Sequence, residues 1–214
     1  MAVDAAPPPW RLAGPNACGL DEVGRGALAG PLVAAAVVLP EGFNHPLLRD
    51  SKLLSEKQRE AIEPAIRKAA LALQIIAIDV DVIDDRGVGW ANRVAFERLI
   101  EKVDAPEYLA DGNLVIRTTR RYQSVVGGDR LVSAVSAASI VAKVYRDRLM
   151  RELHPHFPDY HWADNKGYGT PYHLDAIYRR GMCLHHRRSF VHGDRPRLFD
   201  RAEPARGKPA RSSA

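Results

Sequence analysis

The sequence is poor in cysteine and has no long apolar run, and both absences narrow the class of protein. Its two cysteines, Cys18 and Cys183, lie far apart and outside any CxxC pair. We therefore expect two reduced structural thiols rather than a zinc or redox site. A membrane span needs about 18 consecutive apolar residues without charge, and no such stretch occurs. Residues 1–17 lack the basic start and apolar run of a secretory signal, so we expect a cytoplasmic protein.

Several catalytic motifs are also missing. The chain contains no GxSxG elbow, no Walker A loop and no GxGxxG fingerprint, which speaks against acyl transfer, nucleotide hydrolysis and a dinucleotide cofactor. None of the eight histidines stands in a metal-ligand pattern such as HExxH, so we interpret them as structural or surface residues.

What the chain does have is enough apolar sequence for one sizeable core. Its 214 residues are 46% hydrophobic and 27% charged, which favours one catalytic domain at residues 16–199 between flexible tails at 1–15 and 200–214. The net charge is +5, and basic residues gather at 117–121, at 185–190 and from 195 onward, which favours a polyanionic partner. For the basic C-terminal tail two interpretations stay open: a solubilising end, or a contact with nucleic acid or a protein partner. We expect a monomer.

The apolar pattern predicts an α/β fold with a central mixed sheet, flanking helices and a helical C-terminal segment. Ser55 and Gln58 form a candidate capping box at the start of the first helix, and Pro64 is expected to kink or break that helix. We expect strands at residues 17–20, 31–39, 73–80, 108–111 and 123–126, and helices at 55–69, 90–103 and 131–153.

Four carboxylates stand at expected strand ends, next to glycines or turns: Asp21, Glu22, Asp111 and Asp129. If the strands are neighbours, these side chains meet at one edge, where they would repel each other unless a hard cation such as Mg²⁺ or Mn²⁺ lay between them. Two ions about 3.5–4 Å apart would suit phosphodiester hydrolysis. Taken singly, "DG" and "GGD" are also ordinary turns, so spacing alone leaves both interpretations open.

The chain resembles ribonuclease HII, the bacterial type 2 ribonuclease H, over residues 17–191. The resemblance is carried by "GLDEVGRGALAGPLVAAAVVL", "DSKLLSEKQRE", "ADGN", "GGDRLVSAVSAASIVAKVYRDRLM", "NKGYGTPYHLDAI" and "HRRSF", in that order. It implies a ribonuclease H-like fold in which Asp21, Glu22, Asp111 and Asp129 are the catalytic, metal-binding residues of a two-metal site. It also implies cleavage of the RNA strand of RNA–DNA hybrids and incision of duplex DNA 5′ of an embedded ribonucleotide, which leaves 3′-hydroxyl and 5′-phosphate ends.

The same resemblance implies how the substrate is recognised. The Gly24, Arg25 and Gly26 loop would read the ribose 2′-hydroxyl through backbone groups, which suits glycine because it has no Cβ. Tyr168 would pack on the RNA–DNA junction. An ordinary half-buried tyrosine is the alternative.

Further residues are expected to position the duplex through its phosphates: Lys52, Ser139, Lys143 and Arg146, and also Arg187 and Arg188. For Lys143 and Arg146 a solvated basic face is the alternative, and we expect Asp147 to pair with a neighbouring base. Many family members have a lysine just before the last carboxylate, where this chain has Gly128, so that charge is either missing or supplied by residues 117–121.

Two other functions are weighed against this one. A module that binds hybrids without cutting them would have lost part of the quartet, but all four carboxylates are present. A nuclease for DNA junctions would not need the Gly24–Gly26 loop or Tyr168.

Overall fold

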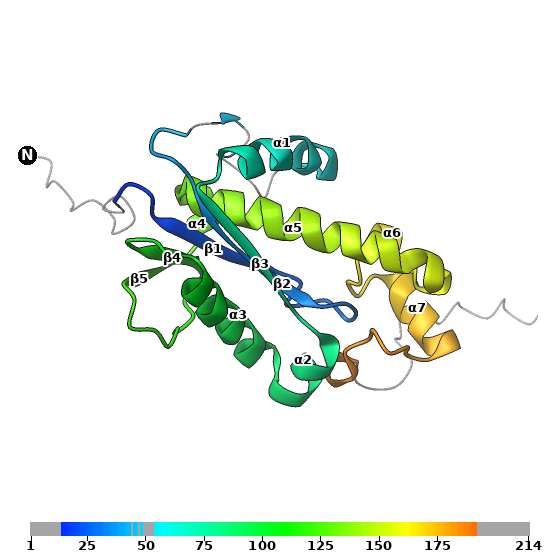
Figure 1. Ribbon diagram of the computed structural model, residues 1–214. Coiled ribbons are helices and arrows are strands. Elements are labelled where there is room, and N and C mark those ends of the chain that lie inside the picture. The colour runs from blue at the N-terminus through cyan, green and yellow to red at the C-terminus, as the bar shows by residue number, and fades with distance from the viewer. Residues whose placement is uncertain (1–13, 44, 47, 49–53, 192–214) are drawn as a thin grey trace, which may run out of the picture.

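A computed structural model describes residues 14–43, 45, 46, 48 and 54–191. Lys52, residues 1–13 of the predicted N-terminal tail and the whole predicted C-terminal tail at 200–214 lie outside these residues. Helices and strands alternate along the first two thirds of the chain, and helices alone follow (Figure 1). The elements are β1 (Cys18–Val23), β2 (Leu32–Val38), α1 (Glu56–Ala69), β3 (Ala72–Ile78), α2 (Val80–Arg86), α3 (Val88–Lys102), β4 (Tyr108–Asp111), β5 (Tyr122–Val125), α4 (Gly128–Leu131), α5 (Ser133–Leu153), η3 (His154–His156), η4 (Pro158–Tyr160), α6 (Trp162–Asn165), α7 (Pro171–Arg180) and η5 (Arg188–Phe190).

The five strands form one mixed sheet in the order β3-β2-β1-β4-β5. The first three strands are antiparallel neighbours, whereas β4 lies parallel to β1 and β5 parallel to β4. This confirms the predicted α/β fold with a mixed sheet. Because β1 and β4 run in the same direction, their C-terminal ends meet at one edge of the sheet.

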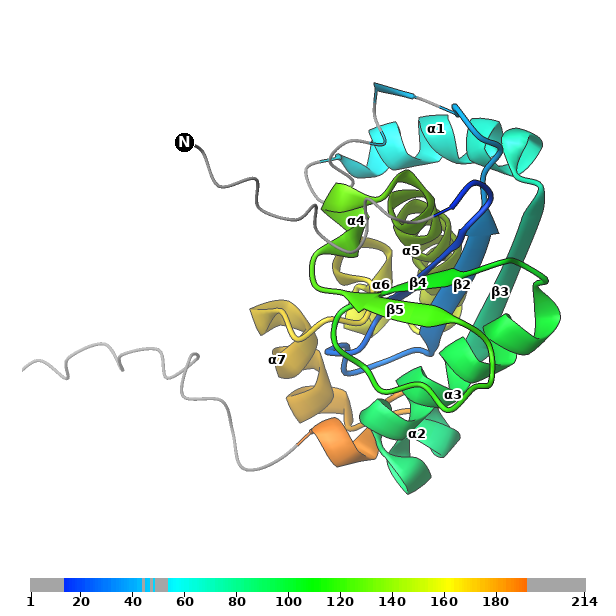
Figure 2. The ribbon, with the colours of Figure 1, turned by 90° about the vertical axis from the view of Figure 1, so that its left-hand side faces the viewer.

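Both faces of the sheet are covered by helices, which explains the uninterrupted apolar sequence of β2. Alternate residues of that strand contribute to different cores, Ala34 and Ala36 to the one that includes α3, and Val33 and Ala35 to the one that includes α1 and α5. The views along and across the sheet show α3 on one side, α5 on the other and α1 outside α5 (Figures 1 and 2). Among the described residues, none of the helices combines the length and the apolar character that crossing a bilayer requires.

The first helix confirms one local prediction and contradicts another. Ser55 caps α1 in a complete capping box with Gln58. The predicted break at Pro64 does not occur, because α1 continues through it to Ala69. Pro64 is on the exposed side of the helix, where water can bond the carbonyl that loses its partner.

Three boundaries also differ from the expected ones. The first strand extends to Val23, so its two carboxylates lie within the strand rather than after it. The third strand ends at Ile78, and a short helix that the pattern did not predict, α2, begins at Val80. The long helix begins at Ser133, after a separate turn of helix, α4.

Helix α5 approaches β1 at Gly19 too closely for any side chain. A Cβ on Gly19 would lie 2.1 Å from the backbone carbon of Ala134. We predict that Gly19→Ala lowers the free energy of unfolding by at least about 2 kcal/mol, because backbone has to move to make room. Urea unfolding followed by circular dichroism measures this.

Gly89 provides the matched control. It is exposed in α3, and no heavy atom of the described residues would lie within 4 Å of its Cβ. Gly89→Ala should therefore stabilise the protein by about 0.5–1 kcal/mol through helix propensity. Equal effects of the two substitutions would contradict the close packing of α5 on β1.

Candidate active site

The parallel pairing of β1 with β4 brings two carboxylates side by side. In this register Leu20 pairs with Ala110, so the next residues, Asp21 and Asp111, occupy adjacent positions on strands that lie about 4.8 Å apart. Their side chains leave the sheet on the same side, because the pleat of neighbouring strands is in phase. The predicted meeting of these two residues is thus a property of the backbone register.

Asp21 is buried on the face of the sheet that α5 covers. Its Oδ1 accepts a hydrogen bond of 2.8 Å from the backbone N–H of Glu22, and its carboxylate is hydrogen-bonded by Ser139 of α5. Burial raises the pKa of Asp21 well above the ordinary value, and the charges of Glu22 and Asp111 raise it further. Ser139, which is predicted to contact phosphate, lies against Asp21 and is placed to orient its carboxylate.

Glu22 points to the opposite face, since successive strand residues alternate. There it meets Asn92 of α3, whose amide hydrogen-bonds it, and Arg25, whose Nη1 lies 3.4 Å from Glu22 Oε1. Burial raises the pKa of Glu22, Arg25 lowers it and Asp111 raises it. Among the described residues, no group donates a hydrogen bond to the buried Glu22 Oε2, which leaves one carboxylate oxygen open to a cation.

Asp111 and Asp129 are connected through the backbone of α4. Gly127 adopts a left-handed conformation with φ of +70°, and the N–H of Gly128 then donates to Asp111 Oδ1 at 2.8 Å. Asp129 follows directly and is completely buried in the first turn of α4. The structure therefore brings Asp21, Glu22 and Asp111 within electrostatic reach of one another and places Asp129 one residue from the bond to Asp111.

These residues have the donor chemistry of a magnesium or manganese site but not its closed geometry. Within the described part of the chain, no group of three or more histidine, cysteine, aspartate or glutamate side chains is arranged to hold a metal ion. Asp21 and Glu22 leave β1 on opposite faces, which separates this pair of candidate ligands. The buried, mutually repelling carboxylates and the open Glu22 Oε2 nevertheless fit a hard divalent cation, which would draw them together at the end of the strand.

A second part of the site is the loop between β1 and β2, whose carbonyls accept hydrogen bonds from a buried arginine of α5. Arg146 is completely buried. Its guanidinium donates to the carbonyls of Ala29, Pro31 and Lys166 at 2.8–2.9 Å. The prediction that Arg146 contacts phosphate is therefore wrong, because all three of its nitrogens are used inside the protein.

Arg187 holds the same loop from the C-terminal side. It is also completely buried, and it donates to the carbonyls of Gly30 and Arg25 at 2.8–3.0 Å. Burial and the neighbouring Arg146 lower the pKa of Arg187. The predicted phosphate contact of Arg187 is wrong for the same reason as that of Arg146. Arg188 is exposed, and its backbone N–H donates to Asp84.

The glycines of the loop differ in what requires them. At Gly24, with φ of +89°, a Cβ would lie 2.3 Å from Arg146 Nε, so the internal packing excludes a side chain. At Gly26, no heavy atom of the described residues would lie within 4 Å of a Cβ, and the residue is exposed. The fold does not require the missing side chain of Gly26, which fits a loop that a ligand approaches closely.

Tyr168 lies beside this loop because its own segment pairs with it. The N–H groups of Leu28 and Ala29 both donate to the carbonyl of Gly167 at 2.8 and 3.1 Å. The ring of Tyr168, which is partly buried, packs against the Arg146 guanidinium at 5.3 Å and the Lys143 ammonium at 5.6 Å.

Lys143 itself is paired with Asp147, as predicted for that aspartate. The Nζ of Lys143 lies 2.6 Å from Asp147 Oδ1, and burial lowers its pKa. The side chain remains 24% exposed, so substrate can still reach this predicted phosphate contact, unlike Arg146.

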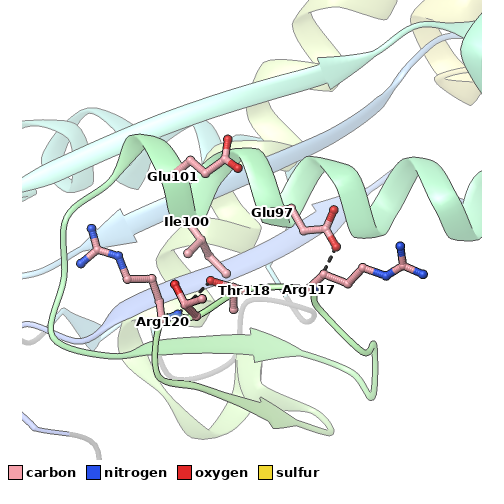
Figure 3. Close-up of a pocket in the computed structure, with 7 residues that line it drawn as sticks. Glu97, Ile100, Glu101, Arg117, Thr118 and Arg120 are labelled. Atoms are coloured by element: carbon pink, nitrogen blue, oxygen red, sulfur yellow. Dashed lines mark hydrogen bonds between the residues drawn. The ribbon is translucent and has the colours of Figure 1, made fainter.

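The basic segment 117–121 lies beside the C-terminal part of α3. It lines a pocket of about 610 Å³ with the end of α3, and the side chains of Arg117 and Arg120 point away from each other there (Figure 3). Arg120 pairs with Asp104, and the carbonyl of Arg121 binds the N-terminal residue of β4, at the opposite end of that strand from Asp111. Arg120 and Arg121 therefore do not supply the charge of the missing lysine.

Sequence reasoning missed Asn92, which is buried against Glu22. A signal was available: Asn92 lies on the apolar stripe of α3, flanked by Ala91, Ala95 and Phe96, where an apolar residue is expected. His173 and His186, which the sequence analysis interprets as structural or surface residues, are both buried.

Comparisons with solved structures identify the class of protein. The fold matches the PCNA:RNase HII complex from Archaeoglobus fulgidus with a TM-score of 0.72 and 24% identity, over 85% of this chain and 98% of that one. It also matches Bst-RNase HIII in complex with Mn²⁺ with a TM-score of 0.59 and 20% identity, over 80% of this chain and 65% of that one. The chain thus has a ribonuclease H fold.

The sequence itself gives the particular family. Residues 18–192 match the family Ribonuclease HII. A Ribonuclease HII from Burkholderia mallei (strain SAVP1) is 47% identical over 176 residues, which cover 81% of this chain and 82% of that protein. This chain belongs to the ribonuclease HII family, whose members are endonucleases that cleave RNA in RNA–DNA hybrids.

The raised pKa of Asp21 predicts a stability that depends on metal and pH. Because the folded state holds this proton more tightly than the unfolded chain, stability falls as pH rises above the ordinary value of 3.8. At pH 7 without metal, Asp21→Asn should raise the free energy of unfolding by about 1–3 kcal/mol. Thermal unfolding in EDTA measures this, and the gain should vanish as the pH approaches 3.8.

Asp104→Asn is the control, since that carboxylate is 90% exposed and its neutralisation should change little. Mn²⁺ should then stabilise the unmodified protein more than the Asp21→Asn variant. A variant that melts below the unmodified protein in EDTA would refute the electrostatic argument.

The loop-holding role of Arg146 gives a separate prediction. A lysine cannot donate to three divergent carbonyls in the planar pattern of a guanidinium, so Arg146→Lys should cost about 2–4 kcal/mol of unfolding free energy. Arg148→Lys, two residues on, changes a half-exposed side chain and should cost less than about 0.5 kcal/mol. Urea unfolding of both variants checks this, and similar losses would argue against the buried contacts.

Proposed function

We propose that this protein incises duplex DNA on the 5′ side of an embedded ribonucleotide, in addition to cleaving the RNA strand of RNA–DNA hybrids. The products are a 3′-hydroxyl and a 5′-phosphate. The observation that carries the proposal is that one helix, α5, contacts both the carboxylate Asp21 and the ring of Tyr168. Its Ser139 contacts Asp21, and its Arg146 and Lys143 pack against Tyr168.

Four residues would hold two Mg²⁺ or Mn²⁺ ions: Asp21, Glu22, Asp111 and Asp129. Bound ions would offset the repulsion of the carboxylates, activate a water for in-line attack and stabilise the leaving oxygen. Ser139 and Asn92 orient Asp21 and Glu22 from the two faces of the sheet. The structurally similar Bst-RNase HIII forms a complex with Mn²⁺, which supports the choice of ion.

Recognition of the ribonucleotide falls to the loop and the tyrosine. Gly24, Arg25 and Gly26 bring backbone groups to the ribose 2′-hydroxyl, which distinguishes RNA from DNA. Gly26 leaves open space for the sugar, and the buried arginines below keep the loop in place. Tyr168 packs on the junction nucleotide, and Lys143 is a reachable phosphate contact.

The other expectations remain part of this proposal. The protein acts as a monomer in the cytoplasm on hybrids and ribonucleotide-containing duplexes. The similar RNase HII from Archaeoglobus fulgidus forms a complex with PCNA, which favours a protein partner for the basic C-terminal tail over a purely solubilising role.

Cleavage of three matched substrates tests the proposal. A duplex with one ribonucleotide and an RNA–DNA hybrid should be cut in Mg²⁺ or Mn²⁺, whereas an all-DNA duplex should not, and EDTA should stop all cutting. Sequencing gels locate the cut 5′ of the ribonucleotide. Equal cutting of the one-ribonucleotide and all-DNA duplexes would reject ribonucleotide recognition and favour a DNA nuclease.

Asp21→Asn separates catalysis from binding in the same assay. It should reduce cleavage by at least about 10³-fold, because the ion site loses a ligand, while hybrid binding in a gel-shift assay changes little. A fully active variant would overturn the assignment of Asp21. Binding without cleavage by the unmodified protein would favour the module that only binds hybrids.

A further inference from the structure

Two buried histidines lie directly behind Tyr168, away from the carboxylates. His173 of α7 is completely buried, and His186 is 2% exposed. Their Nε2 atoms lie 3.1 Å apart. The Nδ1 atom of His173 lies 2.9 Å from the carbonyl oxygen of Tyr168. A chain of hydrogen bonds thus runs from the C-terminal segment to the tyrosine loop.

The neighbours of the two rings determine where their protons are. The indole Nε1–H of Trp162 donates to His173 Nε2 at 3.1 Å, and an indole can only donate. His173 therefore carries its proton on Nδ1 and donates it to Tyr168. The backbone N–H of Cys183 donates to His186 Nδ1 at 3.0 Å, so His186 carries its proton on Nε2 and shares the His173 Nε2 lone pair with the Trp162 donor.

This assignment requires both histidines to be neutral, and their surroundings favour that state. Burial lowers the pKa of His173. Burial first, and then the proximity of His173, lowers the pKa of His186 to about 4. Aromatic rings enclose the pair, among them Tyr160 at 4.5 Å from His186 and Trp162 at 5.4 Å.

The segment that carries His186 also holds the loop between β1 and β2. His186 forms an isolated bridge with Ala29, and the N–H of Arg187 donates to the carbonyl of Leu28 at 2.8 Å. The Arg187 side chain holds Gly30 and Arg25. Residues 185–187 therefore contact both parts of the recognition site. Their backbone and the Arg187 side chain bind the loop between β1 and β2, and His186 reaches Tyr168 through His173.

We propose that His173 and His186 are positioning residues that fix Tyr168 relative to the Gly24–Gly26 loop, and that they thereby set selectivity for a single ribonucleotide. This inference rests on the proposed function of both segments. His173 Nδ1–H and the N–H of Thr170 share the Tyr168 carbonyl, the latter at 2.8 Å. Without the histidine, the Tyr168 carbonyl keeps one of its two donors, and the Tyr168 N–H keeps its bond to the carbonyl of Asn165.

The effect should depend on the substrate. A long RNA–DNA hybrid presents a ribose in every register, so a displaced Tyr168 still meets productive complexes. A duplex with one ribonucleotide has a single productive register, and small misplacements of recognition groups reduce reaction there most. The measured quantity is therefore the ratio of kcat/KM on the one-ribonucleotide duplex to kcat/KM on the hybrid.

Two polar substitutions of His173 separate its two ends. In His173→Asn the side-chain amide can replace Nδ1–H toward Tyr168 but leaves Trp162 without its acceptor. In His173→Gln the amide can replace Nε2 toward Trp162 but leaves the Tyr168 carbonyl without this donor. We expect His173→Asn to keep the ratio within about twofold and His173→Gln to lower it about five- to tenfold, as expected for one lost hydrogen bond.

If the His173 variants do not fold, a pair of His186 variants tests the same inference. His186→Gln keeps a donor toward His173 and should keep the ratio, whereas His186→Leu removes it and should lower the ratio. Tyr160→Phe is the control for stability alone, because it removes a 2.9 Å hydrogen bond to the carbonyl of Gly181 in the same cluster without touching Tyr168. It should lower the melting temperature and leave the ratio unchanged.

A double substitution shows whether His173 acts through Tyr168. Combined with Tyr168→Ala, His173→Gln should have no further effect on the ratio, because coupled residues are not additive. A ratio that follows the melting temperature across all variants, or one that His173→Gln leaves unchanged, would overturn the inference. If the unmodified protein cuts the one-ribonucleotide duplex no faster than all-DNA, the proposed function has failed instead.

Discussion

The burial of two guanidinium groups beneath one loop is the constraint on which the recognition half of the site depends. Arg146 and Arg187 are both completely buried, and between them they bind the carbonyls of four residues in the loop between β1 and β2. A buried cation is costly unless its donors are satisfied, so the loop cannot change shape without leaving a guanidinium unpaired. The backbone near Gly26 is therefore held in one conformation before any substrate arrives.

The catalytic half differs, because its like charges are buried close together and are only partly compensated, by Arg25 and by backbone N–H groups. Asp21 and Asp111 are adjacent through the register of two parallel strands, and Glu22 lies on the other face of the same strand end. Burial raises the pKa of both Asp21 and Glu22. The carboxylates at this edge of the sheet therefore repel each other in their charged form. Bound divalent cations would reduce that repulsion most directly.

The sequence predicted the sheet and its carboxylates because these follow from local pattern. Apolar runs ending at Asp21 and Asp111 identify strand ends, and Ser55 with Gln58 identifies a helix start. It could not reveal the role of Arg146, since a basic residue on a long helix has the same pattern whether it faces water or three carbonyls. The partners of Arg146 lie 20 residues or more away along the chain. Asn92 was missed for the same reason, because packing alone brings it close to Glu22.

Helix α5 connects the two halves and fixes their separation. From Ser139, which touches Asp21, to Arg146, which lies against Tyr168, the helix rises about 10 Å. A helix packed against β1 and α1 along its length cannot stretch, so the distance between the site of chemistry and the site of recognition is constant. Selectivity then depends on whether the recognised nucleotide stands at that fixed distance from the scissile phosphate. A residue such as His173, which shifts neither the carboxylates nor the helix, can still alter selectivity by moving Tyr168 at the far end of this spacing.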